Sequence, residues 1–193
     1  MKNFKTLSRL SLALATLLTI QSAVAADEPW TEDARAVATG VSPKLLQVLT
    51  DAIAKSGAAD AVTVCQDVAP KMAKVASEQS GWQIRRVSLR NRNPKAVPDA
   101  WERETLEDFD RRAAAGEPAA SLERTTVQTV DGKALQRYMR ALPTQGMCLS
   151  CHGSADQLAP GVAERLKALY PEDRAVGYSL GQIRGAMTLK RAP

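Results

Sequence analysis

Apolar residues in the first half of the chain recur at helical spacing. Over residues 31–57 they return every three or four positions, which predicts an amphipathic helix that Pro43 should kink or interrupt. A second helix is expected from about residue 58, with one continuous apolar stripe formed by Ala61, Cys65, Val68, Met72 and Val75. Because Pro70 lies inside this stripe, we expect a break or kink just after Cys65.

The second half of the chain mixes strand and helix patterns. Residues 82–89 predict a strand, and Asp99 with Glu102 is a capping-box signature for a helix that ends at Gly116. Asp131-Gly132 predicts a tight hairpin turn. This turn is expected to join two strands, at residues 122–130 and 133–142. Residues 148–152 should open a short helix, and residues 161–169 should form a further helix. Residues 178–180 and 182–189 are expected to form a final hairpin.

This order of helices followed by mainly antiparallel strands indicates an α+β fold with N-terminal and flanking helices. It excludes the small all-helical fold of cytochrome c, because the predicted strands have no place in that fold.

The N-terminal segment has the features of an export signal. Positive residues up to position 9, an apolar run over residues 10–20 and Ala23-Val24-Ala25 predict a cleavable signal peptide over residues 1–25. The apolar run is too short to span a bilayer. We therefore expect residues 26–193 to form one periplasmic domain. Its formal net charge falls from +5 to +2 once the three positive residues are removed, so we expect no nucleic-acid partner.

Near the C-terminal end, Cys148 and Cys151 are followed by His152, the spacing that attaches a c-type haem. Cysteines three positions apart lie one helical turn apart, so both sulfurs can reach the vinyl groups on one edge of a porphyrin. His152 then lies beneath the ring and can bind the iron. It is the single histidine of the protein, which makes bis-histidine ligation impossible. We expect one covalently attached haem c.

Two other chemistries are alternatives for these cysteines. A C-x-x-C thiol redox pair normally lies where a buried strand passes directly into a helix, whereas Cys148 follows a loop over residues 143–147. A tetrahedral zinc site needs four ligands, so the distant Cys65 would have to join a very tight triplet.

Cys65 itself has two interpretations. The chain has three cysteines, an odd number for a protein in an oxidising compartment. If Cys148 and Cys151 form thioethers, Cys65 has no cysteine with which to form a disulfide. It is then either a small buried apolar residue on its helix or the distal ligand of the iron. The other candidates for the sixth ligand are a lysine, no ligand at all, or one of three methionines: Met72, Met139 and Met187.

Four arginines lie within eight residues, at positions 85, 86, 90 and 92. The simpler interpretation is a solvated strand edge. The functional one is that some of them bind the haem propionates, because a guanidinium group matches carboxylate geometry. Arg90 and Arg92, at the end of the predicted strand, are better placed for this than Arg85 and Arg86.

Three sequence blocks carry a family resemblance: Val64-Cys65-Gln66-Asp67-Val68-Ala69-Pro70; residues 86–94 with 98–102; and residues 148–153 with Tyr170-Pro171, Gly177-Tyr178 and residues 181–186. They resemble the single-haem c-type proteins built on a PAS-like sheet, whose iron is bound by His and Cys. The resemblance spans nearly all of residues 26–193. It implies a PAS-like antiparallel sheet, haem attachment at Cys148, Cys151 and His152, and Cys65 as distal ligand.

A thiolate ligand donates charge and stabilises ferric iron, so a His/Cys haem has a low reduction potential. Such a site suits low-potential electron transfer, or redox or gas sensing in which a diatomic molecule replaces a released ligand. The expected partner is a redox protein or a membrane-bound signalling protein. A peroxidase-like haem enzyme is the alternative, but a distal histidine is lacking, so we expect no enzyme activity.

Overall fold

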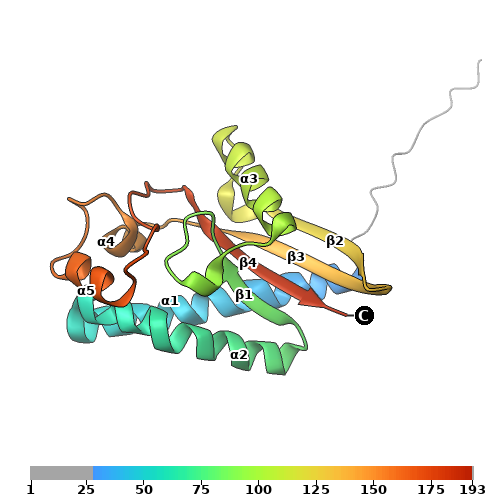
Figure 1. Ribbon diagram of the computed structural model, residues 1–193, viewed down its shortest axis with the longest axis horizontal. Helices are drawn as coiled ribbons and strands as arrows, with labels where there is room; N and C mark the ends of the chain where they lie inside the picture. Colours follow the sequence, from blue (N-terminus) through green and yellow to red (C-terminus); the bar gives the residue numbers. More distant parts are fainter. Residues whose placement is uncertain (1–27, 193) are drawn as a thin grey trace, which may run out of the picture.

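The computed structural model describes residues 28–192, in which helices cover both faces of one antiparallel sheet (Figure 1). The predicted signal peptide lies outside the described residues. Within them, no helix is both long enough and apolar enough to cross a membrane.

The N-terminal half forms a pair of helices joined by a π-helical turn. The elements are α1 (Pro29–Thr63), the turn η1 (Val64–Val68) and α2 (Ala69–Ser80). The predicted boundary near residue 58 is confirmed, because Gly57 has φ 83° and ψ 167° and interrupts the helical backbone of α1. The predicted break beside Cys65 is also confirmed, since that residue lies within η1.

The predicted interruption at Pro43 is wrong, because the backbone stays helical through this residue. A proline inside a helix removes the hydrogen bond to the carbonyl four residues earlier, here that of Thr39. Both residues are on the exposed side of α1, where water can replace the lost donor.

Four strands form the sheet in the order β1-β4-β3-β2, with every neighbouring pair antiparallel. Their bounds are β1 (Gln83–Val87), β2 (Glu123–Val130), β3 (Lys133–Pro143) and β4 (Ile183–Arg191). The predicted hairpin between β2 and β3 is confirmed. Asp131 and Gly132 have φ of 52° and 74°, as a two-residue primed turn requires.

The two faces of the sheet carry separate hydrophobic cores. Helices α1 and α2 cover one face, and α3 (Ala100–Ala114) lies over the other (Figure 1). The α1 side buries Ala34, Ala38, Trp82, Ile84, Tyr138, Met187 and Leu189. The α3 side buries Val87, Leu106, Phe109, Leu122, Met139, Ala141, Ile183 and Ala186. The predicted α+β class is confirmed, and the finer PAS-like relationship stays a prediction.

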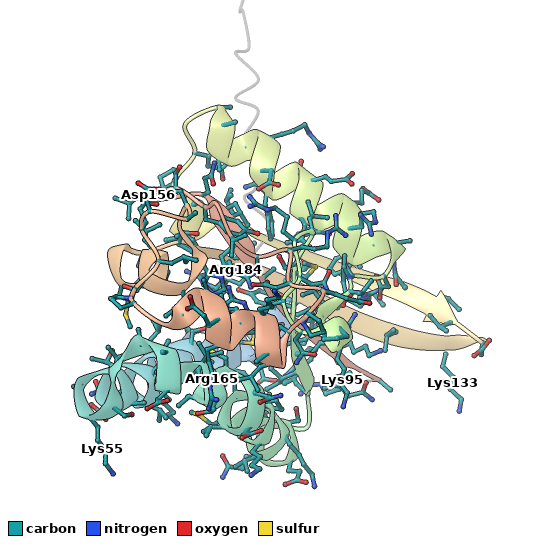
Figure 2. All side chains as sticks on the ribbon, turned by 60° about the vertical axis from the view of Figure 1, so that its left-hand side comes forward. Lys55, Lys95, Lys133, Asp156, Arg165 and Arg184 are labelled. Atoms are coloured by element: carbon teal, nitrogen blue, oxygen red, sulfur yellow. The ribbon has the colours of Figure 1, made fainter. Side chains whose placement is uncertain are left out.

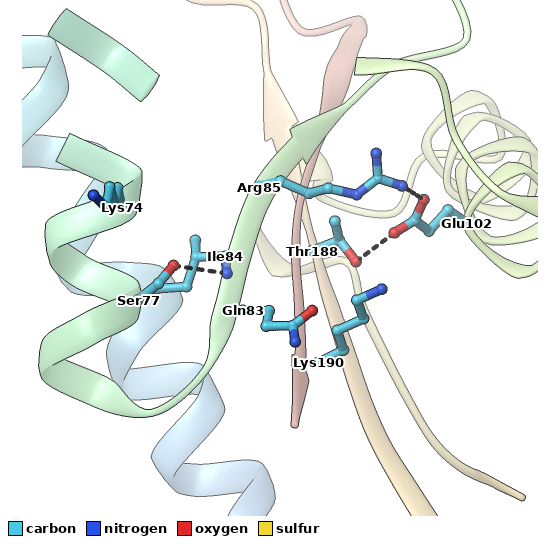
Figure 3. A pocket seen from close by; sticks show the side chains of 8 residues that line it. All are labelled: Lys74, Ser77, Gln83, Ile84, Arg85, Glu102, Thr188 and Lys190. Atoms are coloured by element: carbon cyan, nitrogen blue, oxygen red, sulfur yellow. Dashed lines mark hydrogen bonds and ion pairs between the residues drawn. The ribbon is translucent and has the colours of Figure 1, made fainter. Parts of the chain in front are cut away.

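A buried carboxylate fixes α3 to the sheet. The predicted capping box is present, since Asp99 accepts a hydrogen bond from the backbone N–H of Glu102, whose own side chain accepts from the Asp99 N–H. Glu102 is 1% exposed, pairs with Arg85 and accepts a hydrogen bond from Thr188 Oγ1 at 3.0 Å. These groups line a groove of about 350 Å³ beside β1 (Figure 3).

The C-terminal region packs at one end of the sheet (Figure 1). It contains η4 (Gly146–Cys148), α4 (Leu149–His152) and α5 (Val162–Leu169). A third buried cluster joins this region to the end of α1 through Val62, Val162, Leu166 and Tyr170, with Cys151 packed against it. Two short 3₁₀ turns, at Pro94–Ala96 and Ala119–Ser121, complete the elements.

The predicted final hairpin is wrong. Residues 178–180 are not a strand, and β4 begins only at Ile183. The backbone N–H groups of Gly177 and Tyr178 donate instead to the carbonyls of Gly153 and His152, at 2.7 and 2.8 Å. This loop is therefore attached to the C-x-x-C-H segment and not to β4.

Candidate functional site

The C-x-x-C-H segment is a short, tightly closed helical turn, as expected from the sequence. A 3₁₀ turn ending at Cys148 runs directly into α4, and Gly153 ends it. A Cβ atom at Gly153 would lie 2.6 Å from Gln157 Oε1 and 2.7 Å from the Leu149 carbonyl oxygen. Only glycine fits there, so this residue lets the chain turn immediately after His152.

His152 is held in one orientation by the loop over residues 173–178. Its Nδ1–H donates to the carbonyl oxygen of Ala175 at 2.6 Å. The ring also meets Tyr178 edge to face, with centroids 6.3 Å apart and an interplanar angle of 88°. With the Nδ1 proton committed to Ala175, Nε2 carries the lone pair. This arrangement is typical of metal-binding histidines, whose second nitrogen is fixed by a backbone carbonyl.

The imidazole of His152 is neutral at ordinary pH. Burial is the largest cause and, with the positive charges of Arg184 and Arg92, lowers its pKa to about 2, although the hydrogen bond to Ala175 opposes this. Arg184 Nε lies 3.2 Å from Nδ1 and 3.5 Å from Nε2. Neutral imidazole is the form that binds a metal ion.

Arg92 connects the C-x-x-C-H segment to this loop. It forms a buried ion pair with Asp173 and donates from Nη2 to the carbonyls of Cys151, at 2.6 Å, and Ala175, at 3.4 Å. Arg90 likewise donates to the carbonyls of residues 174 and 176 and lies over the Tyr178 ring, 4.1 Å from its centroid. Both arginines thus position the loop. Their predicted binding of propionates stays a prediction.

Val62, three residues before Cys65, belongs to the buried cluster against which Cys151 packs, so the fold brings Cys65 toward the C-x-x-C-H segment. The Cys151 thiol has its pKa raised by burial first, and the charges of Cys65 and Cys148 raise it further while Arg92 opposes them. Cys65 also raises the pKa of Tyr170, after burial. All three cysteines are free and partly buried. The π-helical turn at Cys65 is of a kind that often marks functional sites.

Arg86 of β1 carries a charge that interacts with Cys65 and Cys148. Solvent reaches its side chain, yet burial among protein atoms lowers its pKa, while the nearby charges of Cys65 and Cys148 raise it. Arg86 shares the helix-facing side of the sheet with Ile84 of β1 and with Met187, its partner in register on β4, both of which are buried.

Arg184 is a second arginine in this region and lies beside His152. Arg184 lies in the middle of the fold, whereas Lys55, Lys95 and Lys133 project outward (Figure 2). Burial and the charge of Arg86 lower the pKa of Arg184 to about 10. In the described part of the chain, neither Arg86 nor Arg184 forms an ion pair with a carboxylate.

The arrangement does not suit a protein-only metal site. Within residues 28–192, no three His, Cys, Asp or Glu side chains are arranged to hold a metal ion, so the tetrahedral zinc alternative has no support. An iron porphyrin requires fewer protein ligands, because the four porphyrin nitrogens already bind the iron and the protein adds only one or two axial ligands. One oriented neutral imidazole, two adjacent thiols and a third thiol nearby fit that requirement.

Comparisons with known proteins agree with this geometry. The family described as Tll0287-like matches residues 10–191. Among solved structures, the crystal structure of the cyanobacterial heme-protein Tll0287 matches with a TM-score of 0.59 and 25% sequence identity, covering 86% of this chain and 97% of that chain. A search of curated protein sequences found no match.

Proposed function

Because this chain belongs to the Tll0287-like family, we propose that it is an exported c-type haem protein with one haem attached through Cys148 and Cys151. His152 is the proximal iron ligand and Cys65 the distal one. When bound, the haem supplies a one-electron redox centre. The homologous cyanobacterial protein is described as a heme-protein, which supports the cofactor assignment.

The observation that carries this proposal is the fixed tautomer of His152. The Ala175 carbonyl accepts the Nδ1 proton at 2.6 Å, which leaves the lone pair on Nε2, and Arg184 Nε lies 3.5 Å from this nitrogen. A neutral ring with a hydrogen-bonded N–H is also what burial alone produces, so it is the two flanking thiols that favour a haem-binding role over packing. Gly153, Arg92 and Asp173 hold the attachment segment against the loop that orients the imidazole.

We assign a carrier or sensor role, acting with a redox protein or a membrane-bound signalling protein. A thiolate opposite the imidazole gives a low reduction potential and a bond that weakens on reduction. A peroxidase-like activity lacks its usual acid–base group, because the single histidine is committed to the iron. Binding of CO or NO to the ferrous protein distinguishes the two roles. Rapid, tight binding indicates a sensor, and an inert six-coordinate haem indicates a carrier.

The ligand set is tested by electron paramagnetic resonance and absorption spectra of the ferric protein. Wild type should give a low-spin His/thiolate signature. Cys65→Ala should lose it and raise the reduction potential while the haem stays covalently attached, and Cys65→Met should also raise the potential. Met72→Leu, on the same apolar stripe, is the matched control and should keep the wild-type spectrum. An unchanged spectrum in Cys65→Ala contradicts thiolate ligation.

A further inference from the structure

Arg184 of β4 lies directly against the imidazole of His152. Its Nε is 3.2 Å from Nδ1 and 3.5 Å from Nε2 of that ring. A group on the outward axis of Nε2, where a metal ion binds, would be nearer to Nε2 than to Nδ1. Because Arg184 Nε is nearer to Nδ1, it lies beside the ring and off that axis. Arg184 can therefore keep its place when the imidazole binds iron.

The backbone of Arg184 is fixed by the close pairing of β4 with the end of β1. A Cβ atom at Gly185, the next residue of β4, would overlap the Val87 carbonyl oxygen and lie 3.2 Å from the Cβ of Ser88. Glycine at this position allows the two strands to approach, which brings Arg184 alongside Ser88. Ser88 Oγ donates to the Arg184 carbonyl oxygen at 2.8 Å.

The guanidinium group of Arg184 is held on the side away from the imidazole. Its Nη1 donates to Ser88 Oγ at 3.1 Å and to the carbonyl oxygen of Arg90 at 3.3 Å. The guanidinium carbon is 5.4 Å from the ring centroid of Tyr178, which itself meets His152 edge to face. These partners are neutral, and within residues 28–192 no carboxylate pairs with Arg184. Its positive charge thus lies beside the imidazole without a carboxylate to neutralise it.

Two other arginines approach the same segment in a different way. Arg92 is paired with Asp173, and Arg90 lies over the Tyr178 ring, 4.1 Å from its centroid. Of the three, Arg184 is the one that contacts the imidazole of His152.

From this contact we infer that Arg184 is a positioning residue that acts through His152 and raises the reduction potential of the proposed haem. A fixed positive charge beside an iron ligand weakens the electron donation of that ligand, and it favours the reduced iron, which carries one positive charge fewer. Surrounding protein screens this interaction less than bulk water would. The inference rests on the proposed function, because it assigns to Arg184 a role toward the iron that His152 binds.

The test measures the reduction potential and the ferric electron paramagnetic resonance spectrum of the haem-loaded protein. Arg184→Gln removes the charge but keeps a hydrogen-bonding side chain, so it should lower the potential while the low-spin signature of wild type remains. Arg184→Lys keeps the charge and should restore the potential toward that of wild type. Arg174→Gln is the matched control. It removes an exposed charge, screened by water, from the loop that also contains Ala175, and should leave the potential unchanged.

A potential that falls in Arg184→Gln and returns in Arg184→Lys, with the control unchanged, supports the inference. An unchanged potential in Arg184→Gln overturns it. Equal falls in the glutamine and lysine variants overturn it because packing would then be responsible, and an equal fall in Arg174→Gln overturns it because net charge alone would be. A fall accompanied by a shifted propionate bending mode in resonance Raman spectra also overturns it, since Arg184 would then bind a propionate.

If Arg184→Gln carries no haem, Ser88→Ala takes its place in the test. This variant removes the hydroxyl that accepts from Nη1 but keeps the charge of Arg184 and the hydrogen bond from His152 to Ala175. A lowered potential then supports the inference, and an unchanged one overturns it. The proposed function fails separately, through the absence of haem in wild type or an unchanged spectrum in Cys65→Ala.

Discussion

Arg92 and Asp173 form an ion pair at 3.0 Å, with side chains only 6% and 10% exposed. The same guanidinium donates to the carbonyl oxygen of Cys151 at 2.6 Å. One buried charge therefore links Cys151 to the loop whose Ala175 carbonyl accepts the hydrogen bond from His152. Buried ion pairs contribute little net stability, but removal of one partner leaves an uncompensated charge.

Arg92→Ala should therefore lower the free energy of unfolding by about 3–5 kcal/mol, the usual effect of breaking a buried pair. Urea unfolding of the haem-loaded protein measures it. Arg111→Ala is the control, because its pair with Asp108 lies on an exposed helix surface and should change stability by only about 0–1 kcal/mol. Equal effects in the two variants would show that Arg92 does not hold the loop.

Gly153→Ala should reduce the fraction of protein that carries covalent haem. The added methyl group would lie 2.7 Å from the Leu149 carbonyl oxygen, which belongs to the backbone of the attachment turn and cannot move away alone. The matched control is Gly146→Ala at the other end of the turn, where an added Cβ meets nothing within 4 Å. The ratio of haem absorbance to protein measures the effect, and equal ratios in the two variants would contradict it.

Stability should fall in acid in part because of Glu123. Burial raises the pKa of this carboxyl group, but hydrogen bonds from Arg35 and Tyr138 and the charges of Arg35 and Arg140 outweigh burial and lower it. A lowered folded-state pKa gives stability that is present above the ordinary value of 4.5 and is lost as the pH falls through the folded-state value.

Glu123→Gln should remove the contribution of the ionised Glu123 carboxylate to the free energy of unfolding. The stability difference between wild type and variant should therefore shrink as the pH falls below 4.5. Unfolding measured from pH 7 downward tests it. Glu164→Gln, an exposed position in the first turn of α5, serves as the control and should follow the wild-type profile. A difference that stays constant or grows in acid would contradict the assignment.

The local elements could be predicted because their signals are local. The Asp99–Glu102 capping box, the Asp131-Gly132 turn and the helix end at Gly57 each depend on a few neighbouring residues, and the structure confirms all three. Pro43 was misread because its cost depends on whether water reaches the freed carbonyl. The predicted strand at Tyr178 is wrong because the backbone hydrogen bonds of Gly177 and Tyr178 go to Gly153 and His152, far earlier in the chain.

The chemistry of the candidate site could be predicted from the sequence, but the contacts that hold its residues in place could not. The spacing of Cys148, Cys151 and His152 predicts an attachment segment, and the structure packs Cys151 against the cluster that contains Val62, three residues before Cys65. The partners of Arg92, namely Asp173 and the Cys151 carbonyl, depend on a loop conformation that no periodicity describes. The face on which Arg86 lies could have been read from the alternation along β1.

The most direct test of a covalent haem at this site is the intact mass of the mature protein, produced in a host with working cytochrome c maturation. We predict the mass of residues 26–193 increased by one haem that denaturation does not remove. The variant with both Cys148→Ala and Cys151→Ala should show the polypeptide mass alone after the same treatment. A wild-type mass equal to that of the bare polypeptide would contradict the account.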